Sequence, residues 1–254
     1  MQQILKTLNE RKTRGQKSLA VLIDPDKVDD LSSLTQLLLV AKECYVDFFF
    51  VGGSLITNNN LSQVVRTIKG NTEIPVVLFP GNTMQIDIQA DAILFLSLIS
   101  GRNPDLLIGQ HVISAPILKG SSLEILPTGY MLVNSESTSA ASYMSNTRPI
   151  PPDKDSVAAC TAMAGEMLGL QLIYMDAGSG SKKTIPSRMI SKVRKSVDLP
   201  LVIGGGINSA EKAKFALEAG ADMIVVGNAI EKNPNLLIEV SEKIYDFNRS
   251  LNVH

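Results

Sequence analysis

The sequence has few of the residues that disulfide-rich, zinc-binding and transition-metal proteins need. Tryptophan is absent, and 254 residues include only two cysteines and two histidines. Cys44 and Cys160 lie far apart and belong to no C-x-x-C pair, so a disulfide framework and a zinc knuckle have no support, and a reducing cytoplasm is favoured. His111 and His254 form no H-x-x-x-H pattern. The sequence therefore lacks the residues for a histidine metal site or a Ser-His-Asp triad.

Excess charge and long apolar runs are also missing. Lys and Arg number 24 against 25 Asp and Glu, and no basic stripe emerges, so we expect no nucleic-acid partner. The most apolar region, 31–56, is interrupted by Lys42, Glu43 and Asp47, which excludes a membrane-spanning run there. Residues 1–14 have an amphipathic pattern rather than the apolar core of an export signal. We therefore expect a cytoplasmic protein without a transmembrane segment.

Short apolar runs alternate with helical patterns along the whole chain. The runs are continuous rather than alternating in polarity, which is typical of parallel strands covered on both faces by helices. Eight such units in 254 residues favour one (β/α)8 TIM-barrel domain over 1–254, since doubly wound sheets usually have fewer strands. The predicted strands are Leu19–Ile23, Val46–Val51, Pro75–Phe79, Ala92–Leu96, Tyr130–Val133, Leu172–Met175, Leu201–Ile203 and Met223–Val226.

Two connections depart from the pattern of a regular barrel. Only 80–91 separate the third and fourth predicted strands, and a parallel crossover needs about a dozen residues or more including its helix. We expect a short coil or turn in place of the third helix and an opening beside the strands. The connection 134–155 is the longest irregular one, and a loop of that length in a compact domain is usually functional.

Glycines follow the last two predicted strands, where TIM barrels commonly bind phosphate. The seventh strand ends in Gly204, Gly205 and Gly206, and the eighth in Gly227 and Asn228. Glycine lets the backbone approach an oxyanion closely, and amide N–H groups at helix N-termini favour negative charge. The pattern predicts a phosphate site. The alternative is that these glycines form turns that only barrel packing requires, because such turns have the same sequence pattern.

The sixth predicted strand leads into a third wall of the same site, the run 174–180. Within it Asp176 lies at the strand tip, close enough to accept a proton from a hydroxyl of a phosphorylated small molecule. An Asx cap that holds the glycine-rich turn is the alternative role of Asp176.

The first predicted strand ends in Asp24, Pro25, Asp26 and Lys27. Carboxylate oxygens suit Mg²⁺, which binds through one or two carboxylates and substrate phosphates. Asp24 directly follows the apolar run and is the better ligand, whereas Asp26 and Lys27 could equally be a helix N-cap and a solvated charge. The Ser54 hydroxyl, after the second strand, could complete the metal or diphosphate shell.

Taken in order, these motifs resemble the geranylgeranylglyceryl phosphate synthase family over nearly the whole chain. The resemblance implies a prenyltransferase that joins the C3 hydroxyl of sn-glycerol 1-phosphate to geranylgeranyl diphosphate in an ether bond, releasing diphosphate with Mg²⁺ as cofactor. It also implies a barrel without its third helix. The motifs are 22–27, 51–54, Phe79-Pro80-Gly81-Asn82, 100–104, 174–180, 204–206 and 226–228.

The resemblance also implies roles for particular residues. Asp24 and Ser54 match the Mg²⁺ positions, and Asp176 matches the catalytic base, although many members have Glu there. Tyr130 is a weaker substrate-binding candidate. The glycerol-phosphate site would comprise Tyr174, Met175, Asp176, Ala177, Gly178, Ser179, Gly180, Gly205, Gly206, Gly227 and Asn228.

The family further implies a homo-oligomer, a dimer or a hexamer, for which Tyr143 and Met144 are candidate contacts. We expect peripheral membrane contact, if any, when product is released. The prenyl tail would leave through the gap of the missing helix, near Phe79, Phe95, Leu96 and Leu98. Three alternatives stay open: a heptaprenylglyceryl phosphate synthase, a phosphate-binding barrel lyase or isomerase, and a lipid- or phosphate-binding protein without turnover.

Overall fold

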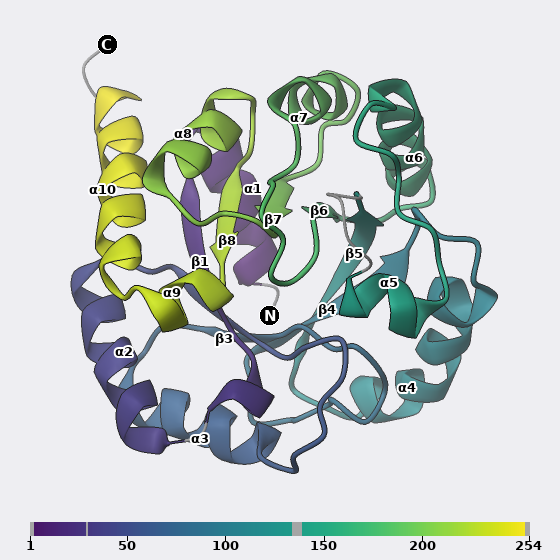
Figure 1. The fold of residues 1–254 in the computed structure, drawn as a ribbon. Coiled ribbons are helices and arrows are strands. Elements are labelled where there is room, and N and C mark those ends of the chain that lie inside the picture. Colours follow the sequence, from purple (N-terminus) through teal and green to yellow (C-terminus); the bar gives the residue numbers. More distant parts are fainter. Residues whose placement is uncertain (1–2, 29, 134–138, 252–254) are drawn as a thin grey trace.

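The computed structural model describes residues 3–28, 30–133 and 139–251. Eight parallel strands close into a barrel in the order of the sequence, with β8 paired to β1 (Figure 1). The predicted barrel is confirmed. The strands are β1 (Ser18–Ile23), β2 (Phe48–Val51), β3 (Val76–Leu78), β4 (Ala92–Leu98), β5 (Glu124–Leu132), β6 (Leu172–Asp176), β7 (Leu201–Gly204) and β8 (Met223–Val226).

Helices surround the barrel, and one of them begins at the predicted N-cap. Ser209 caps the helix after β7, as its side chain accepts a hydrogen bond from the Lys212 N–H. The helices are α1 (Ile4–Thr13), α2 (Leu31–Glu43), α3 (Leu61–Asn71), α4 (Gln110–Lys119), α5 (Ala140–Ser145), α6 (Asp155–Met167), α7 (Ser187–Arg194), α8 (Ala210–Glu218), α9 (Asn228–Lys232) and α10 (Asn235–Ser250), with the short turns η1 (Pro25–Lys27) and η2 (Asp105–Gly109).

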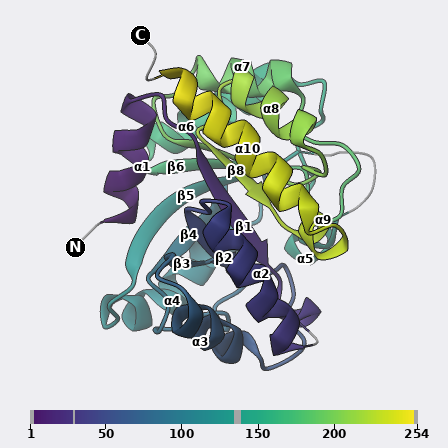
Figure 2. The same cartoon turned by 90° about the vertical axis from the view of Figure 1, so that its left-hand side faces the viewer.

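Alternate side chains of each strand build two cores. On β1, Val21 and Ile23 face the helices, whereas Ala20 faces the barrel interior together with Phe48 and Phe50. The interior core extends to α1, whose N-terminal amides at positions 3, 4 and 5 donate to the Glu124 carboxylate. Figure 2 shows α1 at one end of the barrel and α5 and α9 at the opposite end. Through its buried Ile4, Leu5 and Leu8, α1 thus covers one end of the barrel interior.

The helix that would follow β3 in a regular barrel is absent, as predicted from the short link. Between β3 and β4 the chain forms turns, with the Gly81 N–H donating to the Gln85 side chain at 2.9 Å. Figure 1 shows this loop where a helix would stand between α3 and α4. The largest difference from the predicted strands is in β5, which begins at Glu124 rather than Tyr130, because pairing with β4 overrides the strand-breaking Pro127 and Gly129. The other strands begin and end within two residues of the predicted bounds. Of the long connection, residues 134–138 lie outside the described residues, and the rest contains α5.

No helix among the described residues is long and apolar enough to cross a membrane. Cys44 and Cys160 are both free, the first buried and the second exposed.

Glycine is required where the loop after β2 meets the loop that replaces the third helix. Gly52 has φ of +149°, and a Cβ atom there would lie 2.1 Å from the Phe79 carbonyl oxygen. We expect Gly52→Ala to lower the free energy of unfolding by about 2 kcal/mol or more, because backbone must move. Gly70, exposed in α3 with open space around it, is the control: Gly70→Ala should stabilise by about 0.5–1 kcal/mol. Urea unfolding of both variants checks this, and equal effects would contradict it.

Candidate active site

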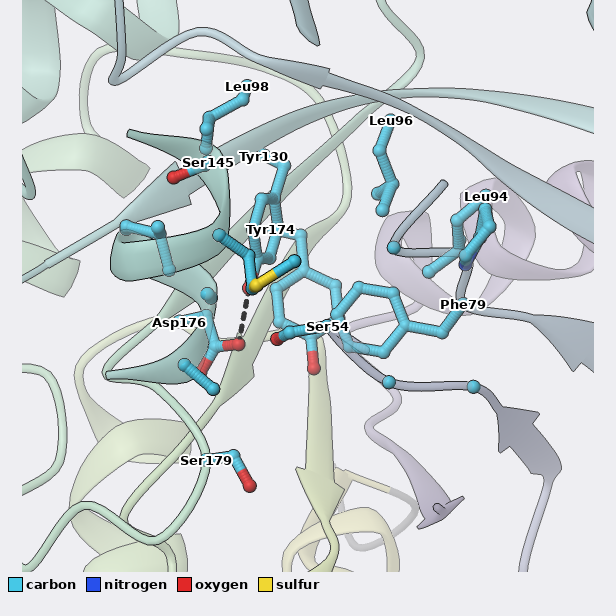
Figure 3. Close-up of a pocket in the computed structure, with 18 of the residues that line it drawn as sticks. Ser54, Phe79, Leu94, Leu96, Leu98, Tyr130, Ser145, Tyr174, Asp176 and Ser179 are labelled. Atoms are coloured by element: carbon cyan, nitrogen blue, oxygen red, sulfur yellow. Dashed lines mark hydrogen bonds between the residues drawn. The ribbon is translucent and has the colours of Figure 1, made fainter. Parts of the chain in front are cut away.

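The carboxyl ends of the strands surround a cavity of 590 Å³. It brings together residues from the loops after β1, β2, β6, β7 and β8 and continues toward α4. Figure 3 shows part of this lining, with Ser54, Asp176 and Ser179 among the labelled residues. Met175 and Ala177 do not line it, because their side chains belong to the core between strands and helices. The predicted site residues that do line it are Asp24, Ser54, Tyr130, Tyr174, Asp176, Gly178, Ser179, Gly180, Gly205, Gly206, Gly227 and Asn228.

The Asp176 carboxylate lies at the centre of this cavity with both oxygens engaged. One oxygen accepts a hydrogen bond from the Tyr130 hydroxyl at 2.6 Å, which Figure 3 marks. The other accepts from the Gly178 N–H at 2.7 Å, so the Asx-cap alternative is also realised. Burial raises the pKa of Asp176, and the two hydrogen bonds oppose that rise because they stabilise the charged form. The result is a carboxylate with strengthened basicity that is fixed in position.

The glycine-rich loop after β7 packs directly against that carboxylate. Gly205 has φ of +74°, and a Cβ atom on it would lie 2.4 Å from Asp176 Oδ1. Gly206 has φ of +71° and would meet the Lys183 carbonyl oxygen at 2.3 Å. Both glycines are needed for a left-handed turn and for close approach. The sequence could suggest the phosphate loop, whereas its contact with Asp176 depends on the pairing of β6 with β7.

Aromatic rings form the floor of the cavity. The ring of Tyr174 stacks on Phe79 with centroids 5.2 Å apart, and Tyr130 meets both rings edge-on at 5.5 and 5.7 Å. Burial raises the pKa of both tyrosines well above the ordinary value, so each phenol keeps its proton. Tyr174, expected in the phosphate site, thus contributes a buried ring below it. The three rings make this part of the cavity lining largely apolar.

A polar bridge crosses the rim from the loop after β1 to the loops after β8 and β6. The Lys27 ammonium donates to the Asn228 side-chain oxygen, and the Asn228 amide nitrogen donates to the Ser179 hydroxyl at 2.8 Å. Lys27 also pairs with Asp24 at 3.1 Å. From the sequence, Lys27 could belong to the metal site or be a solvated charge. Its contact with Asn228, 201 residues away, arises only because the barrel closes.

Asp24 and Ser54 line the same side of the cavity, as expected for a metal site. Asp24 accepts a hydrogen bond from the Asp26 N–H at 3.2 Å and forms an ion pair with Lys27. The described residues contain no group of three or more His, Cys, Asp or Glu side chains placed to hold a metal. One carboxylate and one hydroxyl nevertheless suit Mg²⁺, which keeps waters and binds substrate phosphates rather than an all-protein cage. The residues therefore fit this metal.

Asp26 has a structural role. Its carboxylate accepts hydrogen bonds from the Thr57 and Asn58 amides at 2.7 and 2.9 Å, and these bonds lower the pKa of Asp26. The side chain ties the loop after β1 to the loop after β2. This arrangement orients Asp24 toward the cavity and leaves Asp26 outside it.

A groove extends from the cavity between β4 and α4, with an apolar wall of strand side chains and a more polar wall of helix side chains. Leu94, Leu96 and Leu98 line it from the strand, and α4 turns its polar side inward through Gln110, His111 and Ser114. His111 contacts the Ser97 hydroxyl at 3.2 Å and the Phe95 ring edge-on at 4.4 Å, and burial lowers the pKa of His111, which favours the neutral ring. His111 thus packs, as expected. The inverted polarity of α4 leaves its outer face apolar: Val112, Ile113 and Ile117 are 65%, 61% and 55% exposed.

Comparison with known proteins agrees with this geometry. A model described as the PcrB family matches residues 11–245. The geranylgeranylglyceryl phosphate synthase of Spirosoma linguale is 55% identical over 96% of this chain and 98% of its own, and that of Pyrococcus furiosus is 39% identical over 92% of each.

Solved structures give the same answer. The (S)-3-O-geranylgeranylglyceryl phosphate synthase of Thermoplasma acidophilum, in complex with sn-glycerol-1-phosphate, superposes with a TM-score of 0.90, 30% identity and coverage of 97% of this chain and 100% of that one. A thiamine phosphate pyrophosphorylase from Pyrococcus furiosus, 14% identical with a TM-score of 0.55, shares the fold alone. The chain belongs to the PcrB family, in which these relatives are geranylgeranylglyceryl phosphate synthases.

Proposed function

We propose that the protein is a prenyltransferase that joins the C3 hydroxyl of sn-glycerol 1-phosphate to geranylgeranyl diphosphate. The observation that carries this proposal is a single cavity in which a buried carboxylate, Asp176, lies between glycine-rich loops and an apolar groove. The loops suit a phosphate, and the groove suits a hydrocarbon tail. A relative with 30% identity was crystallised with sn-glycerol-1-phosphate, which supports that acceptor.

The acceptor phosphate would lie against the backbone of Gly205, Gly206 and Gly227, beside Asn228. With its phosphate fixed there, the C3 hydroxyl comes within reach of Asp176. Hydrogen bonds from Tyr130 and the Gly178 N–H hold the carboxylate in one orientation. A fixed base and a fixed nucleophile reduce the entropy lost on reaching the transition state.

The donor would place its diphosphate near Asp24 and Ser54 and its tail in the groove beside β4. Mg²⁺ held by these two residues would neutralise the charge that develops on the leaving diphosphate. The groove lining, Phe79, Phe95, Leu96 and Leu98 among it, supports a tail path through the gap of the missing helix. A structure with a bound prenyl diphosphate analogue tests the path.

The reaction forms one bond and breaks another. The bond between C1 of the prenyl group and the diphosphate oxygen breaks, and its electron pair leaves with the diphosphate. The C3 oxygen of the acceptor bonds to C1, and its proton passes to Asp176. The aromatic floor excludes water, which would otherwise compete with the acceptor for the allylic carbon.

We also infer a homo-oligomer, a dimer or a hexamer. Its support is the apolar outer face of α4 and the exposure of Tyr143 and Met144, 78% and 50%, since apolar patches of this kind mark interaction sites. Peripheral membrane contact during product release would use the same kind of surface. A cytoplasmic location, consistent with two free cysteines, completes the proposal.

Replacing the proposed base tests the mechanism. We expect Asp176→Asn to lower turnover about a hundredfold or more, because the amide cannot accept the hydroxyl proton. Purified protein, Mg²⁺, radiolabelled sn-glycerol 1-phosphate and prenyl diphosphates of graded length give the rate and the preferred donor. Acceptor affinity should persist, and Asp153→Asn, on the exposed surface, is the control. Unchanged turnover would remove Asp176 from the mechanism, and no ether product from the parent protein would reject the proposed function.

The hydrogen bond from Tyr130 predicts a pH effect. Because Tyr130 stabilises the charged carboxylate, Tyr130→Phe should raise the pKa of Asp176 further. The base works only when deprotonated, so kcat/KM should fall off at a higher pH in Tyr130→Phe than in the parent. The exposed Tyr143 provides the control Tyr143→Phe. If kcat/KM fell off at the same acidic pH in the parent and in Tyr130→Phe, the assignment of Asp176 as the base stabilised by Tyr130 would be contradicted.

The proposed metal site predicts a changed Mg²⁺ requirement. Asp24→Ala removes the one carboxylate of the site, so the Mg²⁺ concentration for half-maximal rate should rise by about tenfold or more. Titration of the prenyl transfer rate with Mg²⁺ measures it. An unaltered metal response would show that Asp24 is not a ligand.

A further inference from the structure

The cavity has little positive charge for the anions it would hold. Asp24, Asp105 and Asp176 line it, whereas none of its described lining residues is a lysine or an arginine. Burial favours the neutral form of His111, the remaining basic side chain of the lining. A phosphate monoester and a diphosphate must therefore bind beside carboxylates. Backbone amides supply only partial charges, so a full cation close to both anions would matter.

Two lysines reach described residues of the rim, and their surroundings differ. The Lys212 ammonium is bound by three neutral oxygens, those of Lys182 and Asn208 at 2.7 Å and that of Gly206 at 3.4 Å. The Lys27 ammonium instead bridges Asp24 and Asn228. Lys27 thus contacts one residue on each side of the proposed site. Asp24 is the proposed metal ligand on the donor side, and Asn228 lies in the phosphate loop after β8 on the acceptor side.

We propose that Lys27 is the cation that binds both anionic groups, contacting the acceptor phosphate beside Asn228 and the donor diphosphate beside Asp24. The inference rests on the proposed function, because it names the role of one more residue in that site. Lys27 would then be a substrate-binding residue rather than the solvated charge considered from the sequence.

The geometry of the ammonium allows this role. An ammonium has three N–H donors; Lys27 donates one to Asn228 and forms an ion pair with Asp24 at 3.1 Å. Its side chain is 36% exposed, so it can shift toward an incoming phosphate at little cost. Asn228 would stay in place, because its amide nitrogen also donates to Ser179 at 2.8 Å. Hydrogen bonds between charged partners are about twice as strong as neutral ones.

A purely structural role makes a different prediction. If Lys27 only tethers Asn228 to the loop after β1, an uncharged donor at this position would serve as well. Lys27→Gln keeps a hydrogen-bond donor without charge, Lys27→Arg keeps the charge, and Lys27→Met keeps neither. The three variants separate charge from tethering.

Calorimetric binding of sn-glycerol 1-phosphate, and separately of inorganic pyrophosphate with and without Mg²⁺, tests the proposal without turnover. We expect Lys27→Met and Lys27→Gln to weaken both ligands by about tenfold, and Lys27→Arg to recover most of the affinity. Lys214→Met removes the same charge from the exposed side of α8, where Lys214 pairs with Glu218, and should leave both dissociation constants within about twofold.

Two results would overturn the proposal. Parent-like affinities in Lys27→Gln would assign Lys27 a tethering role, and loss of only one ligand would restrict it to one half of the site. Should Lys27→Met fail to fold, as judged by circular dichroism, Lys27→Gln and Lys27→Arg give the same comparison. Charge-dependent binding in a protein that forms no ether would keep Lys27 as an anion ligand and reject the proposed function instead.

Discussion

Closure of the barrel is the constraint on which the site depends. Pairing of β8 with β1 places Lys27 against Asn228, and pairing of β6 with β7 places Asp176 against Gly205. None of these contacts joins residues near one another in sequence. Parallel strands also direct all their carboxyl ends to one rim. The ring of hydrogen-bonded strands thus assembles a site from loops that have little structure of their own.

Burial of the Asp176 carboxylate has an unfavourable electrostatic free energy. A carboxylate buried above aromatic rings loses solvation, and the Tyr130 hydroxyl and the Gly178 N–H offset part of that loss. The pKa of Asp176 is nevertheless raised, which suits the role of proton acceptor that we propose for it. Asp176, one methylene shorter than glutamate, reaches both donors because Gly205 leaves space beside it.

The missing helix after β3 and the inverted polarity of α4 both shape the groove beside β4. Without a helix after β3, the cavity continues along β4 and is walled by the polar side of α4, through Gln110, His111 and Ser114. In an ordinary barrel helix that side would be apolar. Turning it inward leaves Val112, Ile113 and Ile117 outward. The groove in which we propose that the prenyl tail binds thus accompanies an apolar surface on the opposite side of the same helix.

Sequence alone determined the elements of this protein, because strand burial, helix caps and a twelve-residue link are encoded locally. Apolar runs indicated the eight strands, and the motifs that follow them predicted part of the cavity lining, including Asp24, Asp176 and the glycines. The tertiary structure decided what these residues touch: Met175 and Ala177 turn away from the cavity, β5 continues through Pro127, and Lys27 spans the rim. Orientation and partnership depend on strand register and barrel closure, which bring together residues far apart in the chain, and no local pattern records them.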